Sequence, residues 1–135
     1  IVGVHVRLGD VVNGFIENNR IAFSESEVYR ILKEYLVFST LKTEDVCFVI
    51  CSDGNIDPQQ FSDLNIFITK NNPAEDLWLL SRTQVIIGAD SSFAITASYI
   101  GNIPFIVFKR DKIDWEYYKN KVGFFENKYV ERSIY

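Results

Sequence analysis

The sequence predicts an α/β domain built on a doubly wound parallel sheet of about five strands. Short apolar runs recur along the chain, and segments with helical periodicity separate them. The runs are apolar throughout instead of alternating with polar residues, which is typical of strands buried on both faces of a sheet. Short connections between alternating strands and helices favour parallel pairing and a Rossmann-like topology.

Five apolar runs are expected to form the strands. Most are rich in β-branched or aromatic residues, and several end in the Gly, Asp and Ser residues that are common in turns. A loop is expected over residues 11–23, and Pro58 is expected to open a short helical turn. The expected strands cover residues 1–7, 46–51, 66–69, 85–88 and 105–108.

Three longer helical segments are expected between these strands. Ser24 and Glu27 match the Ser-x-x-Glu capping box that begins many helices. Apolar residues follow at helical spacing: Val28, Ile31, Leu32, Tyr35 and Leu36. The other two helices are expected over residues 73–82 and 93–100, the second stopping at Gly101.

Composition excludes several classes of function. The 135 residues are enough for one domain with a hydrophobic core. The net charge of -4 disfavours a nucleic-acid-binding protein, which usually carries a basic excess. No apolar run reaches membrane-spanning length, so no transmembrane segment is expected. A single histidine and two cysteines disfavour a zinc site.

The two cysteines, Cys47 and Cys51, are expected to stay reduced. They lie four residues apart on one expected strand, a separation of about 13 Å, whereas a disulfide needs Cα atoms within about 7 Å. Free thiols favour the cytoplasm, or the cytoplasmic face of a membrane. Because the sequence opens inside a strand and contains no Met, we expect it to be a piece of a longer protein.

Two parts of the chain differ in composition. Residues 1–110 carry the alternating strands and helices and are expected to form the Rossmann-like domain. Residues 111–135 mix aromatic and charged side chains and are expected to form a helical tail. Aromatic residues at this density usually pack against something. The partner of the tail is either the sheet domain or a missing half of the protein.

Polar residues follow three of the expected strands. Because the carboxyl ends of parallel strands meet at one edge of a sheet, the three groups should lie close together. Arg7 has the planar charged fork that suits a phosphate, and a helix that begins after Ser91 would present free amides. The pattern predicts an anion site for a nucleotide diphosphate. Simple pairing of Arg7 with Asp10, and simple capping by the serines, remain alternatives. The groups are His5, Arg7, Gly9 and Asp10; Ser52, Asp53 and Gly54; and Asp90, Ser91 and Ser92.

Several common catalytic motifs are missing from the sequence. There is no Walker A pattern, no Gly-x-Gly-x-x-Gly and no Gly-x-Ser-x-Gly, which disfavours an NTPase, a dinucleotide oxidoreductase and an α/β-hydrolase. Asp53 has no partner in an Asp-x-Asp pair, so metal-bridged nucleotide binding is not indicated. An arginine and a helix N-terminus can neutralise a leaving diphosphate without metal.

Three segments resemble the superfamily of α1,2-, α1,6- and protein O-fucosyltransferases. Residues 5–10, HVRLGD, are similar to its His-x-Arg-Arg-x-Asp motif. Residues 51–53, CSD, match its short Ser-Asp motif after a strand. Residues 76–81, DLWLLS, followed by VIIGADSSF at 85–93, are similar to the α1,2-fucosyltransferases of glycosyltransferase family 11. The segments occur in family order and span most of residues 1–108.

The resemblance implies the donor-binding, C-terminal half of a two-domain GT-B-type enzyme. Such an enzyme inverts the anomeric centre, uses GDP-fucose as donor and needs neither metal nor another cofactor. A glycan acceptor would bind through the missing domain.

The resemblance also implies roles for individual residues. Arg7 would contact the β-phosphate and stabilise the departing GDP, His5 would line the same pocket, and Asp10 would orient Arg7 or its loop. Asp76 would face the guanine or the ribose. Ser91 and Ser92 would hold the diphosphate. The donor-binding set implied is Arg7, Ser52, Asp53, Asp76, Ser91, Ser92 and Phe93, with Arg7, His5 and Asp10 as catalytic residues.

The chain departs from the family pattern at three places. Leu8 replaces the second arginine, Asp90 stands where the family often has Asn, and Ala94-Ile95 replaces paired tryptophans. Two alternatives therefore stay open, namely a glycosyltransferase that uses another nucleotide sugar and a non-catalytic Rossmann-like interaction module. The acceptor, the catalytic base and the oligomeric state do not follow from the sequence.

Overall fold

A five-stranded, all-parallel sheet forms the centre of the protein. The computed structural model describes residues 1–7, 23–70, 72–109, 111–120 and 122–124. The strand order is β3-β2-β1-β4-β5, and every neighbouring pair is parallel. The predicted α/β, Rossmann-like sheet is therefore confirmed. The strands are β1 (Val2–Val6), β2 (Phe48–Ser52), β3 (Ile66–Ile68), β4 (Val85–Gly88) and β5 (Phe105–Val107).

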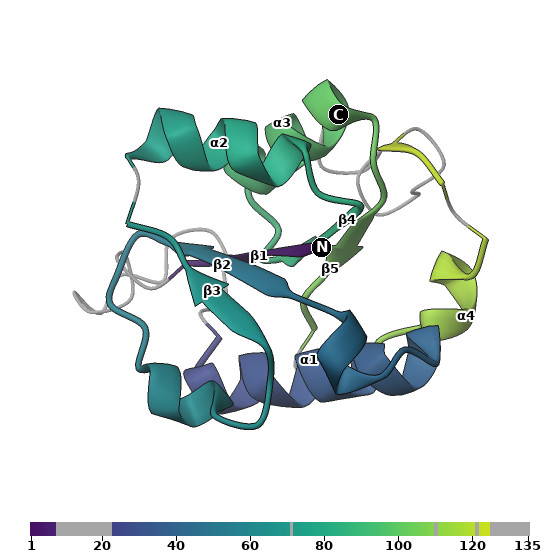
Figure 1. Cartoon of the computed structure of the whole chain (residues 1–135). Coiled ribbons are helices and arrows are strands. Elements are labelled where there is room, and N and C mark those ends of the chain that lie inside the picture. Colours follow the sequence, from purple (N-terminus) through teal and green to yellow (C-terminus); the bar gives the residue numbers. More distant parts are fainter. Residues whose placement is uncertain (8–22, 71, 110, 121, 125–135) are drawn as a thin grey trace.

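Helices cover both faces of this sheet (Figure 1). The longest, α1, lies on one face together with the single-turn α4, while α2 and α3 lie side by side on the other face. Two short 3₁₀ turns, η2 and η3, complete the described elements. The helical elements are α1 (Glu25–Ser39), η2 (Thr43–Asp45), η3 (Pro58–Phe61), α2 (Pro73–Ser81), α3 (Ser92–Gly101) and α4 (Trp115–Tyr118).

Most predicted boundaries hold within one or two residues. The capping box of α1 is present, because the Ser24 side chain accepts from the Glu27 amide and the Glu27 carboxylate accepts from the Ser24 amide. The second strand begins two residues later than predicted. The Val46 amide donates to the Thr43 carbonyl and closes a 3₁₀ turn, so pairing starts only at Phe48. The predicted loop over 11–23 lies almost entirely outside the described residues.

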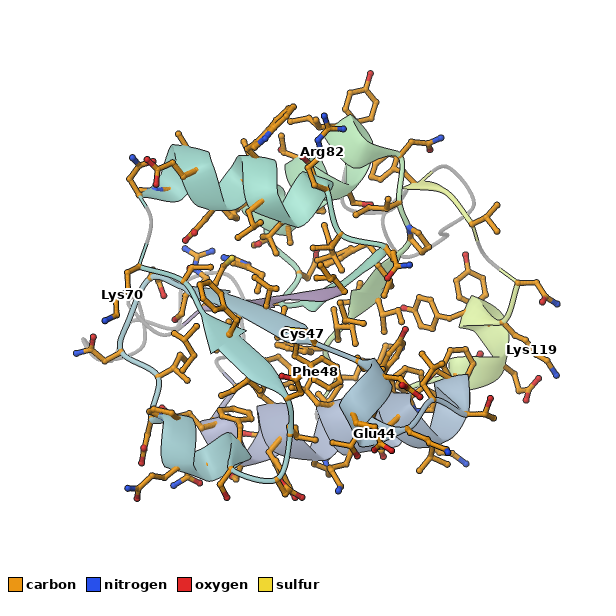
Figure 2. The ribbon with its side chains drawn as sticks, viewed as in Figure 1. Glu44, Cys47, Phe48, Lys70, Arg82 and Lys119 are labelled. Atoms are coloured by element: carbon orange, nitrogen blue, oxygen red, sulfur yellow. The ribbon has the colours of Figure 1, made fainter. Side chains whose placement is uncertain are left out.

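The sheet separates two hydrophobic cores, which explains why its strands are apolar throughout. In β1, Val2, Val4 and Val6 belong to the core on the α1 side. The neighbouring Phe48 of β2 points from the sheet toward α1 (Figure 2). The opposite core lies under α2 and α3 and contains the alternate residues of β2, β4 and β5. On that side β1 contributes Gly3, where an added Cβ would lie 2.8 Å from a methyl carbon of Leu80.

The described part of the tail packs against both layers. The Trp115 ring stacks on Phe38 of α1 with a centroid distance of 5.1 Å. The Tyr118 hydroxyl accepts from the Val107 amide of the edge strand β5. Phe124 belongs to the core under α2 and α3. The described aromatic residues thus have partners within this chain. Helix α4 is a single turn, and the division of the chain at residue 110 stays a prediction.

Gly101 has a packing role that the sequence did not reveal. It was expected to stop α3, but it is the last helical residue, and Asn102 adopts the left-handed conformation with φ of 48°. A Cβ on Gly101 would lie 2.1 Å from the Ser81 carbonyl oxygen. The glycine therefore permits the close approach of α3 to the end of α2.

Replacing Gly101 with alanine should destabilise the protein. In an ordinary helix this change is favourable by about 1 kcal/mol, but here the new methyl group meets a backbone atom that cannot turn away. We expect a loss of about 2 kcal/mol or more in the free energy of unfolding. Chemical denaturation of Gly101→Ala measures it. Gly123→Ala is the matched control, because its Cβ would meet only the end of the Asn102 side chain. Equal effects of the two changes would contradict the packing role.

Candidate functional site

A pocket of about 340 Å³ opens at the carboxyl edge of the sheet. It lies at the ends of β1 and β2 and is closed by the first turns of α2 and α3. Every described residue that the sequence singled out as catalytic or donor-binding lines it. Asp10 lies outside the described residues. The lining residues are His5, Arg7, Cys51, Ser52, Asp53, Pro73, Asp76, Ser91, Ser92 and Phe93.

The strand register explains how β1 reaches this pocket. His5 pairs with Gly88 of β4 across the sheet. A Cβ on Gly88 would lie 3.0 Å from both the Cβ and the carbonyl oxygen of His5. The glycine thus leaves room for the imidazole on the side of the sheet that α2 and α3 cover. Arg7 lies two residues further along the chain, just beyond the end of β1, and also lines the pocket.

The His5 imidazole is buried and neutral. It is 8% exposed, its Nδ1 lies 3.3 Å from the Ser91 hydroxyl oxygen, and its ring stacks on Phe93 with a centroid distance of 4.9 Å. Burial lowers the pKa of His5 to about 4; the Asp53 charge opposes this shift and the Arg7 charge adds to it. A group with so low a pKa is a weak base at neutral pH. A Ser91–His5 nucleophile pair is therefore not supported.

Helix α3 directs backbone amides at the pocket. Ser91 is its N-cap, and its hydroxyl accepts from the Ala94 amide at 3.3 Å. The Ile95 amide donates to the Ser91 carbonyl. The amides of Ser92 and Phe93 have no acceptor among the described residues, as is usual in the first turn of a helix. The Ser91 hydroxyl is engaged by the helix and by His5, so these two amides, together with the hydroxyl of the pocket-lining Ser92, are donors that α3 offers to an anion.

Helix α2 contributes a carboxylate instead. Its first residue, Pro73, has no amide proton, and the Asn72 side chain caps the Glu75 amide at 3.0 Å. Asp76, one turn into the helix, is only 6% exposed. Its Oδ1 is fully buried and has no hydrogen-bond partner among the described residues. Such an oxygen costs free energy unless a donor reaches it.

Cys51 lies beside this carboxylate. It is the fourth residue of β2 and is 1% exposed. Burial, and after it the charge of Asp76 and a hydrogen bond with that carboxylate, raise the pKa of the Cys51 thiol to about 12, while a hydrogen bond with Thr69 opposes the shift. The thiol therefore stays protonated at neutral pH. Cys51 was not predicted to line the pocket, because the two cysteines were expected only to stay reduced on one strand. Its place directly before Ser52 and Asp53 is the sequence feature that could have indicated it.

The remaining pocket residues form the turn after β2. The Ser52 hydroxyl accepts from the Gly54 amide at 3.1 Å, which fixes this turn. Asp53 is exposed, and its charge reaches His5. Among the described residues that line the pocket, Arg7 is the cation, and Asp53 and Asp76 are the carboxylates. The pocket is thus polar at both ends but not uniformly charged.

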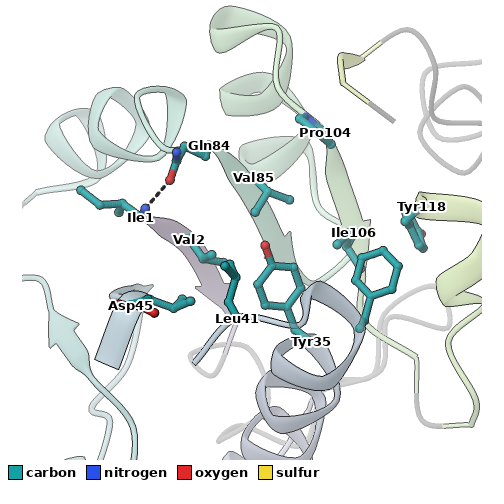
Figure 3. A pocket seen from close by; sticks show the side chains of 12 residues that line it. Ile1, Val2, Tyr35, Leu41, Asp45, Gln84, Val85, Pro104, Ile106 and Tyr118 are labelled. Carbon is teal, nitrogen blue, oxygen red and sulfur yellow. Dashed lines mark hydrogen bonds between the residues drawn. The ribbon is translucent and has the colours of Figure 1, made fainter. Parts of the chain in front are cut away.

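A second cavity, of about 300 Å³, lies at the opposite, amino edge of the sheet. Figure 3 shows Tyr35 of α1, Leu41 and Tyr118 around it, together with the first residues of β1 and β4. A hydrogen bond from the Ile1 amino group to Gln84 Oε1 lies at its rim. Its lining residues are mainly aliphatic and aromatic, with Asp45 and Gln84 as polar side chains beside the two tyrosines.

The described residues hold neither a metal-binding cluster nor a membrane-spanning helix. No group of three or more His, Cys, Asp or Glu side chains among them could hold a metal ion. None of the helices found in that part of the chain is long and apolar enough to cross a membrane. Comparison of the whole sequence with known protein families and with curated proteins gives no match.

The buried His5 should make stability depend on pH. The unfolded chain takes up a proton on this residue near its ordinary pKa of 6.5, whereas the folded protein does so only near 4. The free energy of unfolding should therefore fall as the pH drops from 6.5 to 4, by on the order of 3 kcal/mol. Urea unfolding across this range, compared with His5→Asn, isolates the contribution. Identical pH dependence in the two proteins would show that His5 is not the cause.

Proposed function

We propose that this chain is the donor-binding domain of a metal-independent, inverting glycosyltransferase that transfers fucose from GDP-fucose to a glycan hydroxyl. The single observation that carries the proposal is the composition of the carboxyl-edge pocket. Its lining combines the cation Arg7, the first residues of α3 and a buried carboxylate oxygen of Asp76 that has no partner among the described residues. A nucleoside diphosphate carries the complementary groups at its two ends.

The phosphate end of the ligand would lie against α3. Ser92 and Phe93, at the start of α3, and Arg7 all line this pocket. A helix N-terminus and an arginine are both common phosphate-binding groups. In open α/β sheets the ligand lies where the strand order reverses, and here β1 lies between β2 and β4.

The nucleoside end would lie against α2. The Asp76 oxygen needs an N–H or O–H donor, which a guanine ring or a ribose hydroxyl supplies. Helix α2 offers few free amides there, because Pro73 lacks one and Asn72 caps another. The two helix starts therefore differ in chemistry. We expect a nucleotide to lie with its phosphate end at α3 and its nucleoside end at α2.

The proposed reaction breaks the bond between the anomeric carbon and the diphosphate oxygen. The electron pair leaves with GDP, and Arg7 and the α3 amides stabilise the charge that develops on it. A hydroxyl oxygen of the acceptor forms the new bond from the opposite face of the sugar, and its proton passes to a base. We assign no described residue as this base or as a group that binds the acceptor. The free thiols Cys47 and Cys51 favour a cytoplasmic location or the cytoplasmic face of a membrane.

Calorimetric titration with GDP, GDP-fucose, GDP-mannose and UDP, without added metal, tests the proposal. We expect the GDP species to bind and UDP to bind at least about tenfold more weakly. Arg7→Ala should weaken GDP binding about tenfold to a hundredfold, because it removes a charge-assisted contact. Arg82→Ala is the matched control, since Arg82 lies at the far end of α2 and stacks over Trp78. Equal losses in the two variants would argue against a phosphate role for Arg7.

A change at Asp76 should separate binding from stability. Asp76→Asn keeps the shape of the side chain but removes a buried charge, so we expect no loss in the unfolding temperature of the ligand-free protein. GDP affinity should nevertheless fall about tenfold, because the ligand donor loses a charged acceptor. Thermal unfolding and calorimetry of the same samples measure both effects. A large loss of stability with unchanged affinity would assign Asp76 a purely structural role.

The same titrations decide between the alternatives. Preference for UDP or another nucleotide would keep the glycosyltransferase class and change the donor. Absence of binding to every nucleotide, in the chain and in the full-length protein, would favour the non-catalytic interaction module.

A further inference from the structure

We infer that His5 is a positioning residue, which holds the first turn of α3 in the place where its amides bind phosphate. The inference rests on the proposed function and assigns to His5 a role other than a catalytic one. It places the phosphate-binding power of the site in Arg7 and in the Ser92 and Phe93 amides, with His5 acting on them indirectly.

Contacts from His5 reach the segment that links β4 to α3 at three points. Its carbonyl oxygen accepts from the Ala89 amide at 3.3 Å. Its Nδ1 meets the Ser91 hydroxyl, and its ring stacks on Phe93 at an interplanar angle of 29°. Gly88 provides the space for the ring. His5 therefore connects β1 to the turn from β4 into α3 through its carbonyl oxygen, its Nδ1 and its ring face.

The hydrogen bonds of Ser91 fit this role. The hydroxyl oxygen accepts from the Ala94 amide, which leaves its proton to donate to the unprotonated Nδ1 of a neutral imidazole. The proton of the ring then resides on Nε2. In this arrangement the hydroxyl satisfies the helix and the histidine together, and it has no proton left for a phosphate.

The imidazole itself brings no charge to the ligand anion, and its remaining hydrogen-bond donor is the Nε2 proton. It is neutral, Nδ1 is occupied by Ser91, and one ring face lies against Phe93. A neutral ring adds no positive charge to the pocket. Its contribution is to fix the distance between the end of β1, which carries Arg7, and the start of α3, which carries the amides. This distance matters because a bound phosphate would contact both groups at once.

Two substitutions distinguish positioning from direct contact. Asn carries a polar atom at the place of Nδ1, whereas Gln carries one at the place of Nε2. His5→Asn should therefore keep the bond to Ser91, and His5→Gln should lose it. We expect GDP affinity within about threefold of the unmodified protein for His5→Asn and a loss of about tenfold for His5→Gln, the usual effect of one hydrogen bond. The opposite order, with Gln retaining affinity and Asn losing it, would overturn the inference.

Amide NMR resonances of Ser92 and Phe93 provide a readout that needs no ligand. They should stay in place in His5→Asn and shift in His5→Gln, while unfolding temperatures show that both variants are folded. Unmoved resonances in a folded His5→Gln variant would overturn the inference. If the unmodified protein binds neither GDP nor inorganic pyrophosphate, the proposed function fails, and the resonances alone decide whether His5 positions α3.

The single histidine of the chain allows a direct check of its tautomer. Imidazole ¹⁵N spectra should show a protonated Nε2 and an unprotonated Nδ1 in the unmodified protein. Ser91→Ala should change the Nδ1 signal, whereas Thr96→Ala, which removes an exposed hydroxyl from the same helix, should leave it unchanged. A protonated Nδ1 in the unmodified protein would overturn the proposed hydrogen-bond arrangement.

Discussion

The pairing of β1 with two parallel neighbours is the constraint on which the rest of the structure depends. Because β1 lies between β2 and β4, its residues are covered on both faces, and its end is brought beside the starts of α2 and α3. A central strand that is covered on both faces is apolar along most of its length, and in β1 the polar residue His5 stands next to the carboxyl end. The polar groups of the pocket are consequently confined to the strand ends and the helix starts that follow them.

The two helices that close the pocket are built differently although they occupy equivalent places. Helix α3 begins with Ser91 and keeps amides available, whereas α2 begins with Asn72 and Pro73 and then buries Asp76. The Asp76 Oδ1, which has no hydrogen-bond partner in the described part of the chain, is unfavourable for the ligand-free fold. Buried groups that lower the stability of the ligand-free protein are common in binding sites. This contrast between two helix starts is the strongest physical reason to regard the pocket as functional.

Much of the fold could be predicted from the sequence because it depends on local patterns. Apolar runs located all five strands, and the Ser24–Glu27 capping box located the start of α1. Strand-end polar residues were expected to share one sheet edge, and the described ones line one pocket except Asp90, which is exposed and not part of its lining. The close approach at Gly101 and the burial of Cys51 against Asp76 were not predictable, since both depend on contacts between segments distant in sequence. The assignment of a donor rests on resemblance and stays a proposal.

The protonated thiol of Cys51 bears on how the pocket responds to its chemical surroundings. Oxidants, electrophiles and soft metal ions react with the thiolate, and a pKa of about 12 leaves almost none of it at neutral pH. Burial beneath α2 also keeps large reagents away. The half-buried Cys47 is the more accessible of the two thiols. A change in the redox state of the surroundings would thus modify the protein away from the pocket and leave the carboxylate end of the site chemically intact.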